Sequence, residues 1–263
     1  MLALKLVLVP TILALVSMAG RRWGPAVGGW LGGFPLVACP IFVLLSIEQG
    51  PRFAADTAAA TLSAVGGTVV YVTAYARLCV RAPWLATVTA ALAAWLASAI
   101  PLVLLALPPV PALAFTALTL ALGKKVVPEV TFPPGATGLP RSELVLRMLA
   151  GAAVTVLITG LSDAVGSTWT GLMAVFPTMG LVLAVCSHRA QGGQYAQVLL
   201  RGMLNGLFAF TTFCFALTVA LPRLGIVGGF AAALGAAGAV HWYSLGRIRR
   251  AAMTRAMVPE RAG

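Results

Sequence analysis

Long apolar segments, each about the length of a membrane-spanning helix, occupy most of this chain and most constrain how it can fold. A helix needs about 20 predominantly apolar residues to cross the hydrocarbon core of a bilayer. Apolar residues fill 60% of the 263 positions and charged residues only 9%, and the mean hydropathy is +0.98. Soluble domains of this size do not have such a composition. We therefore expect an all-α integral membrane protein that crosses the bilayer several times.

Nine segments have the length and composition of spanning helices. They are residues 2–20, 24–47, 53–76, 83–100, 101–122, 143–161, 168–187, 195–220 and 224–245. The stretch 83–122 leaves two alternatives, because it contains several prolines that a helix interior tolerates poorly. It forms either two spans that meet at a tight turn near Pro101, or one long span with a re-entrant piece.

Basic residues between the apolar segments predict the orientation, because cytoplasmic loops carry an excess of Lys and Arg. With nine spans, an outside N-terminus and a cytoplasmic C-terminus, most basic residues fall on the cytoplasmic side. These are Arg21, Arg22, Arg77, Arg81, Lys124, Lys125, Arg141, Arg189 and the basic residues of the tail 246–263. The net charge of +12 thus indicates topology, and we expect membrane lipids rather than nucleic acid as the partner of these residues.

A pattern in the first half of the chain returns in the second half after a shift of 142 residues. The shift places Phe34-Pro35 on Phe176-Pro177 and Gln49-Gly50 on Gln191-Gly192. Proline and glycine at corresponding positions of two apolar segments are typical of transporters built from internal repeats, where they mark the binding site. The sequence therefore predicts a duplicated membrane protein.

An odd number of spans would invert the second copy relative to the first. The first repeat, residues 1–100, would begin outside, and the second, residues 143–245, would begin inside. Residues 101–142 would supply a connecting helix and a cytoplasmic loop. We thus predict two inverted four-helix repeats related by a pseudo-two-fold axis in the membrane plane, the architecture of alternating access.

The two Phe-Pro pairs predict helix breaks near mid-bilayer. Proline lacks the amide hydrogen and clashes with the preceding turn, so a helix breaks before it and a new helix N-terminus is exposed. Such N-termini favour an anionic group. The candidate substrate-binding residues are Gly33, Phe34, Pro35, Phe176, Pro177 and Thr178. The alternative is a pair of kinks that only shape packing, and the glycines of residues 28–33 fit close helix packing as well as room for a substrate.

Charged and polar residues inside the predicted spans supply further candidates, because each is costly in a bilayer. Arg201, with Asn205 one turn further on, is a candidate anion ligand, unless its side chain extends to the cytoplasmic headgroups. Glu48 and Asp56 are candidates for proton coupling, with solvated helix ends as the alternative reading. No P-loop, paired carboxylates, Ser/His dyad or metal-ligand cluster is found in any span, so we expect no enzyme activity, cofactor or metal.

Each half, the first more than the second, resembles the GlpM-like family of small bacterial inner-membrane proteins. The resemblance covers about fifty residues, from the glycine-led stretch 28–36 through the mid-helix Phe-Pro to Ile47-Glu48-Gln49-Gly50. The second half departs from the pattern, since Ala190 stands where Glu48 would be and Thr178 where Leu36 would be. The resemblance implies a multi-pass protein of the bacterial inner membrane, a fused version of a unit that elsewhere pairs with itself. It leaves a homodimer of the whole chain open.

Together these features predict a secondary transporter that moves a small anionic solute through a site between the two Phe-Pro breaks. Two other functions remain open. A lipid or lipid-phosphate flippase would use the same breaks for a headgroup phosphate. A non-transporting membrane scaffold or assembly subunit would use its glycine-lined surfaces for packing and its basic tail for docking.

Overall fold

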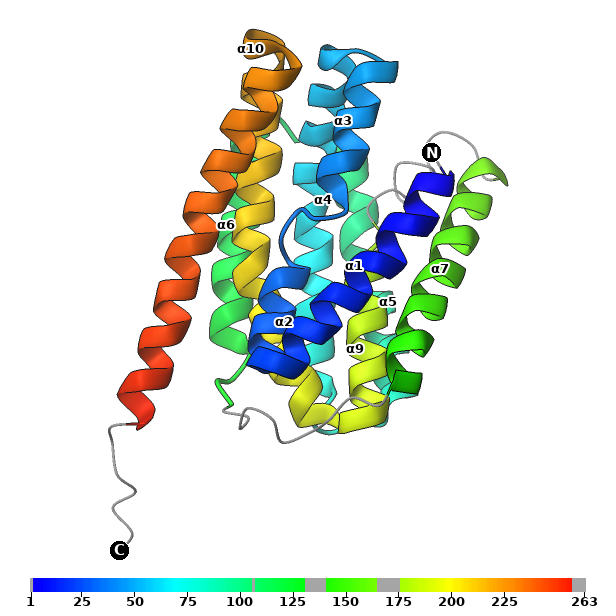
Figure 1. The fold of residues 1–263 in the computed structure, drawn as a ribbon, viewed down its shortest axis with the longest axis vertical. Helices are drawn as coiled ribbons and strands as arrows, with labels where there is room; N and C mark the ends of the chain where they lie inside the picture. The colour runs from blue at the N-terminus through cyan, green and yellow to red at the C-terminus, as the bar shows by residue number, and fades with distance from the viewer. Residues whose placement is uncertain (1, 106, 131–140, 165–175, 257–263) are drawn as a thin grey trace, which may run out of the picture.

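A computed structural model describes residues 2–105, 107–130, 141–164 and 176–256 of the chain (Figure 1). Every regular element in these ranges is a helix. The helices are α1 (Leu2–Trp23), α2 (Pro25–Gly32), α3 (Ala38–Glu48), α4 (Pro51–Leu78), α5 (Trp84–Leu105), α6 (Pro109–Val126), α7 (Arg141–Ala164), α9 (Thr178–Gln191) and α10 (Gly193–Ala256). The all-α prediction is therefore confirmed for the described part of the chain.

Five of these helices contain apolar stretches long enough to cross a membrane, which makes the chain a multi-pass membrane protein. The stretches are Ala3–Trp23, Pro51–Leu78, Trp84–Leu102, Ser142–Gly160 and Gly193–Gly246. The outer surface is accordingly apolar, as a surface that faces lipid must be. Large side chains such as Val227 and Leu104 are well exposed on it.

The long element α10 consists of two helices joined at Gly225. This residue has a φ of 68°, which glycine adopts without steric cost. Figure 1 shows the chain reversing at that end of the bundle, so that the two arms of α10 run side by side. The predicted spans 195–220 and 224–245 correspond to these two arms.

The structure corrects the boundary predicted near Pro101. Two helices are present, as the first alternative required, but α5 continues through Pro101 to Leu105 and α6 begins at Pro109. Proline is tolerated inside membrane helices where neighbouring groups compensate for the lost backbone bond. Proline at the first position of a helix also has the right φ and lacks only an amide that would be unpaired there, so Pro109 marks the helix start. The predicted repeat boundary at residue 100 therefore falls inside α5.

The first arm of α10 and α4 form the centre of the bundle, and α2 packs closely against α10. Glycines make this last contact possible. A Cβ atom at Gly29 would lie 1.7 Å from the carbonyl oxygen of Leu199, and one at Gly202 would lie 2.2 Å from that of Ala26. The packing role predicted for the glycines of residues 28–33 is therefore confirmed for Gly29, because a larger residue at this helix crossing would overlap the backbone of α10.

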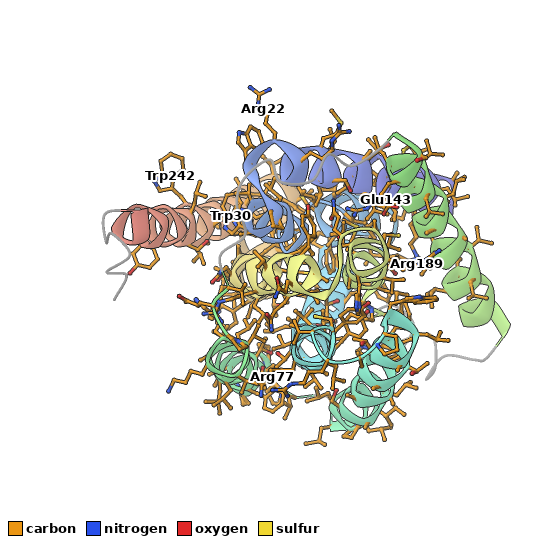
Figure 2. The ribbon with its side chains drawn as sticks, turned by 90° about the horizontal axis from the view of Figure 1, so that it is seen from below. Arg22, Trp30, Arg77, Glu143, Arg189 and Trp242 are labelled. Carbon is orange, nitrogen blue, oxygen red and sulfur yellow. The ribbon has the colours of Figure 1, made fainter. Side chains whose placement is uncertain are left out.

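The beginning of α1 and the end of α10 lie at opposite ends of the bundle (Figure 1). Figure 2 looks at the lower end, where Arg22 and Trp242 point outward from the rim. The Trp242 side chain is 77% exposed. Exposed tryptophan beside basic residues is typical of the membrane–water interface.

Candidate binding site at the helix breaks

The first predicted helix break is present between α2 and α3, about midway along the bundle (Figure 1). The two helices are about 12 and 16 Å long, so together they match one membrane span. Between them the Leu36 amide donates a hydrogen bond to the Phe34 carbonyl oxygen over 2.7 Å, and the Cys39 amide donates to the Pro35 carbonyl oxygen over 2.9 Å. A bond between residues i and i+2 characterises a γ-turn. Pro35 is therefore the centre of a tight turn in the middle of the bundle.

The second Phe-Pro pair has the same backbone structure. The Thr178 amide donates to the Phe176 carbonyl oxygen over 2.8 Å, and the Leu181 amide donates to the Pro177 carbonyl oxygen over 2.8 Å. Pro177 has φ −76° and ψ 55°, values typical of an inverse γ-turn. Each bond lies 142 residues after its counterpart at the first break. The predicted helix before Phe176 falls on residues 165–175, which lie outside the described part.

The helices that follow the two breaks also end alike. Gly50 has φ 91° and ψ 160°, and Gly192 has φ 87° and ψ 170°. A new helix begins at the next residue in each case, α4 at Pro51 and α10 at Gly193. Both glycines adopt a positive φ that other residues reach only at a cost. The Gln-Gly pairs found in the sequence are thus the same backbone turn used twice.

The structure brings both breaks to one segment of α10. A Cβ atom at Gly33, beside the first break, would lie 2.6 Å from the carbonyl oxygen of Met203. A Cβ atom at Gly180, in the first turn of α9, would lie 3.5 Å from the terminal methyl of the same Met203. Both breaks therefore adjoin Met203, and a movement of α10 at this point affects both.

Aromatic side chains close the first break. The Phe34 ring lies 4.5 Å from the ring of His241, which stacks on Trp30 at 3.5 Å. The Trp30 indole nitrogen donates a hydrogen bond to the Ser244 hydroxyl oxygen over 2.8 Å. The second arm of α10 thus packs its side chains onto the first break and fills the space beside it.

Buried donors without acceptors lie beside the second break. The Phe176 ring meets the edge of Trp95 at 5.2 Å, and a Cβ atom at Gly180 would lie 3.5 Å from Cε1 of Tyr71. Tyr71 and Trp95 are 0% and 2% exposed. Within the described part of the chain, neither the Tyr71 hydroxyl nor the Trp95 indole nitrogen has a hydrogen-bond partner. Each unpaired buried donor costs about 1–3 kcal/mol, so their presence at a helix break needs a reason.

Arg201 contacts the end of α6 rather than either break. Its guanidinium donates to the carbonyl oxygens of Lys124, over 2.8 Å, and Val127, and it forms an ion pair with Glu129. The Asn205 amide donates to the Arg201 carbonyl oxygen over 3.3 Å. A basic side chain at these last carbonyls stabilises the C-terminal end of a helix. The role of Arg201 and Asn205 as anion ligands stays a prediction.

The predicted proton-coupling residues lie away from the breaks. Glu48 ends α3, Asp56 lies in the second turn of α4, and both are exposed. The structure thus places both carboxylates at one exposed end of the bundle, and proton coupling by them stays a prediction.

The most deeply buried charge in the described part of the chain is one that the sequence alone does not single out. Arg147 of α7 is 1% exposed and forms an ion pair with Glu143 at 3.2 Å. It also donates to the hydroxyl oxygens of Ser17 in α1 and Ser187 in α9, over 3.2 and 3.1 Å. Figure 2 shows Glu143 at the junction of these helices. Arg147 therefore ties α7 to two neighbouring helices.

Comparison with known protein families, with curated proteins and with solved structures finds no match for this chain.

Proposed function

We propose that this protein is a secondary transporter that moves a small anionic solute across the membrane by alternating access. One observation carries the proposal, namely that Pro35 and Pro177 stand at the centres of equivalent backbone turns, one shortly before α3 and one directly before α9. Broken helices in both halves of a membrane protein are a feature of transporters, because irregular backbone inside the bilayer is tolerated only where it is buried or lines a cavity.

The proposed architecture has two inverted units. The first consists of α1, the pair α2 and α3, α4 and α5. The second begins with α7, includes α9 and ends with the two arms of α10, and α6 connects the units. The opposite placement of the two chain ends supports an odd number of crossings. Inverted units allow equivalent motions to open a central site to either side.

The shared contact with Met203 supports a coupled movement of the two breaks. Gly33 beside the first break and Gly180 beside the second both adjoin this residue. The two breaks therefore contact the same part of α10. The helix starting at Thr178 directs its positive N-terminus toward the middle of the bundle. That end favours an anionic solute over a cationic one.

Metabolite profiling of cells and medium tests the proposal for many small solutes at once. Cells that express the native chain are compared with cells that express equal amounts of a Pro35→Leu, Pro177→Leu variant. A Pro101→Leu, Pro222→Leu variant is the matched control, because these two prolines lie inside helices and not at a break. We expect a solute that is redistributed by the native chain and the control and not by the first variant.

The absence of any redistributed solute would contradict the proposed transport function. If no solute changes in any comparison while all variants reach the membrane, transport of a small solute is excluded. The lipid-flipping and scaffold functions would then be tested instead, with labelled lipids in proteoliposomes and with cross-linking to partner chains.

A further inference from the structure

The two unpaired donors beside the second break lie at the same level of the bundle. Helices α4 and α5 pack against each other, and a Cβ atom at Gly67 would lie 3.1 Å from the Cβ atom of Ala99. The helices run in opposite directions, since a short turn joins them. One turn further along α4 and one turn back along α5 lead to Tyr71 and Trp95. Tyr71 and Trp95 therefore lie at one level of the interior.

The first turn of α9 lies at that same place. The ring of Tyr71 adjoins Gly180, the third residue of α9, and the ring of Trp95 adjoins Phe176. The first turn of a helix presents backbone N–H groups that have no acceptor within the helix. The Thr178 and Leu181 amides of this turn already donate to the Phe176 and Pro177 carbonyl oxygens, which leaves the amides of Met179 and Gly180. The Tyr71 hydroxyl and the Trp95 indole N–H can also donate, and both are buried without a partner in the described residues.

We infer that Tyr71, Trp95 and the first turn of α9 bind the carboxylate of a small solute that has an apolar body. A carboxylate only accepts hydrogen bonds and is the complement of a site built from donors. The neighbouring side chains Phe176 and Met203 are apolar and suit an apolar body. The inference rests on the proposed transport function and names its site and solute class.

The two halves of the chain differ at these positions. The residues that lie 142 positions after Tyr71 and Trp95 are Phe213 and Ala237, both buried and both without a side-chain donor. Phe213 packs between the rings of Phe42 and Phe230. The pair of donors from Tyr71 and Trp95 is therefore a feature of the second break. At the first break the ring nitrogens of His241 are also buried without partners in the described residues, but that ring is stacked on Trp30.

Binding of benzoate to the purified native chain in lipid nanodiscs tests the inference, with isothermal titration calorimetry as the measurement. We expect saturable binding of benzoate and none of benzylamine, which has the same ring and a cationic, donor-only head. Tyr71→Phe and Trp95→Phe should each weaken benzoate binding about tenfold, the loss of one hydrogen bond to a charged group.

Tyr75→Phe is the matched control. Tyr75 lies one turn from Tyr71, is equally buried and is paired with Nδ1 of His188 at 3.3 Å, so its hydroxyl already has a partner. This variant should bind benzoate like the native chain. Equal binding by the native chain, Tyr71→Phe and Trp95→Phe would overturn the inference, as would the absence of benzoate binding at millimolar concentration.

The result is separable from the transport test. Benzoate binding that depends on Tyr71, together with no redistributed solute in cells, would support the site and remove the transport function. A solute redistributed in a Pro35- and Pro177-dependent way, together with no benzoate binding, would retain transport and remove this site.

Discussion

Replacing Arg147 with methionine is expected to remove most of the stability that this bundle gains at the junction of α1, α7 and α9. The guanidinium is 1% exposed, pairs with Glu143 and donates to the hydroxyls of Ser17 and Ser187. Methionine fills much of the same volume and supplies none of these bonds. Glu143, at 11% exposed, would then be left as a mostly buried carboxylate without a counter-charge.

The expected cost follows from that unpaired carboxylate. Removing one partner of a buried ion pair typically destabilises a protein by about 3–5 kcal/mol, whereas replacing both partners with apolar residues is often close to neutral. The variant Glu143→Leu, Arg147→Met should therefore be much more stable than Arg147→Met alone. In the double variant, the hydroxyls of Ser17 and Ser187 can donate hydrogen bonds to backbone carbonyls of their own helices instead.

Reversible unfolding in mixed detergent micelles would measure these free energies, with Arg223→Met as the control. Arg223 is exposed, and substitution of an exposed residue usually changes stability by less than about 0.5 kcal/mol. The reasoning would be refuted if Arg147→Met cost no more than Arg223→Met. It would equally be refuted if the double variant were as unstable as Arg147→Met.

Two further predictions concern helix packing and the end of α6. Gly29→Ala should push α2 away from α10 and lower the free energy of unfolding by about 1–3 kcal/mol through overpacking, because the new methyl would overlap a backbone carbonyl of α10. Unfolding measurements check this, with Gly160→Ala as the control because a methyl group at Gly160 would meet open space. Arg201→Met should release the carbonyls of Lys124 and Val127 and accelerate amide hydrogen exchange in the last turn of α6 by about tenfold, a loss of about 1.4 kcal/mol. Unchanged exchange there would show that Arg201 does not hold this turn.

The sequence could predict the breaks and turns because proline, glycine and the apolar run length act locally. The break at Phe34-Pro35, the turn at Phe176-Pro177 and the boundary between the predicted spans 195–220 and 224–245 lie where the sequence predicts them. Pro101 shows the limit of this reasoning. Whether a membrane helix ends at a proline depends on the groups that surround it, and these are set by neighbouring helices.

The polar residues of the interior are harder to predict, because their partners come from distant parts of the chain. For Arg147 the sequence offers one signal of pairing, the position of Glu143 one helical turn before it. Arg201 is the stronger candidate for a binding residue in the sequence, because it lies deeper in a predicted span. Its partners in the structure nevertheless lie at and beyond the end of α6. Tyr71 carries no such signal, since its missing partner becomes visible only when α4, α5 and α9 are packed.

The two breaks share a backbone turn but differ in the side chains that lie beside them. At the first break, the ring of His241 stacks on Trp30 and contacts Phe34, although its two ring nitrogens have no hydrogen-bond partner in the described part of the chain. At the second, the donors of Tyr71 and Trp95 remain without acceptors in the described part of the chain. A well-packed aromatic cluster gains its contact energy without any ligand, whereas buried donors gain theirs only when an acceptor arrives. In the proposed site, a carboxylate would supply the missing acceptor for Tyr71 and Trp95, whereas the stacked rings at the first break would stay packed against the second arm of α10.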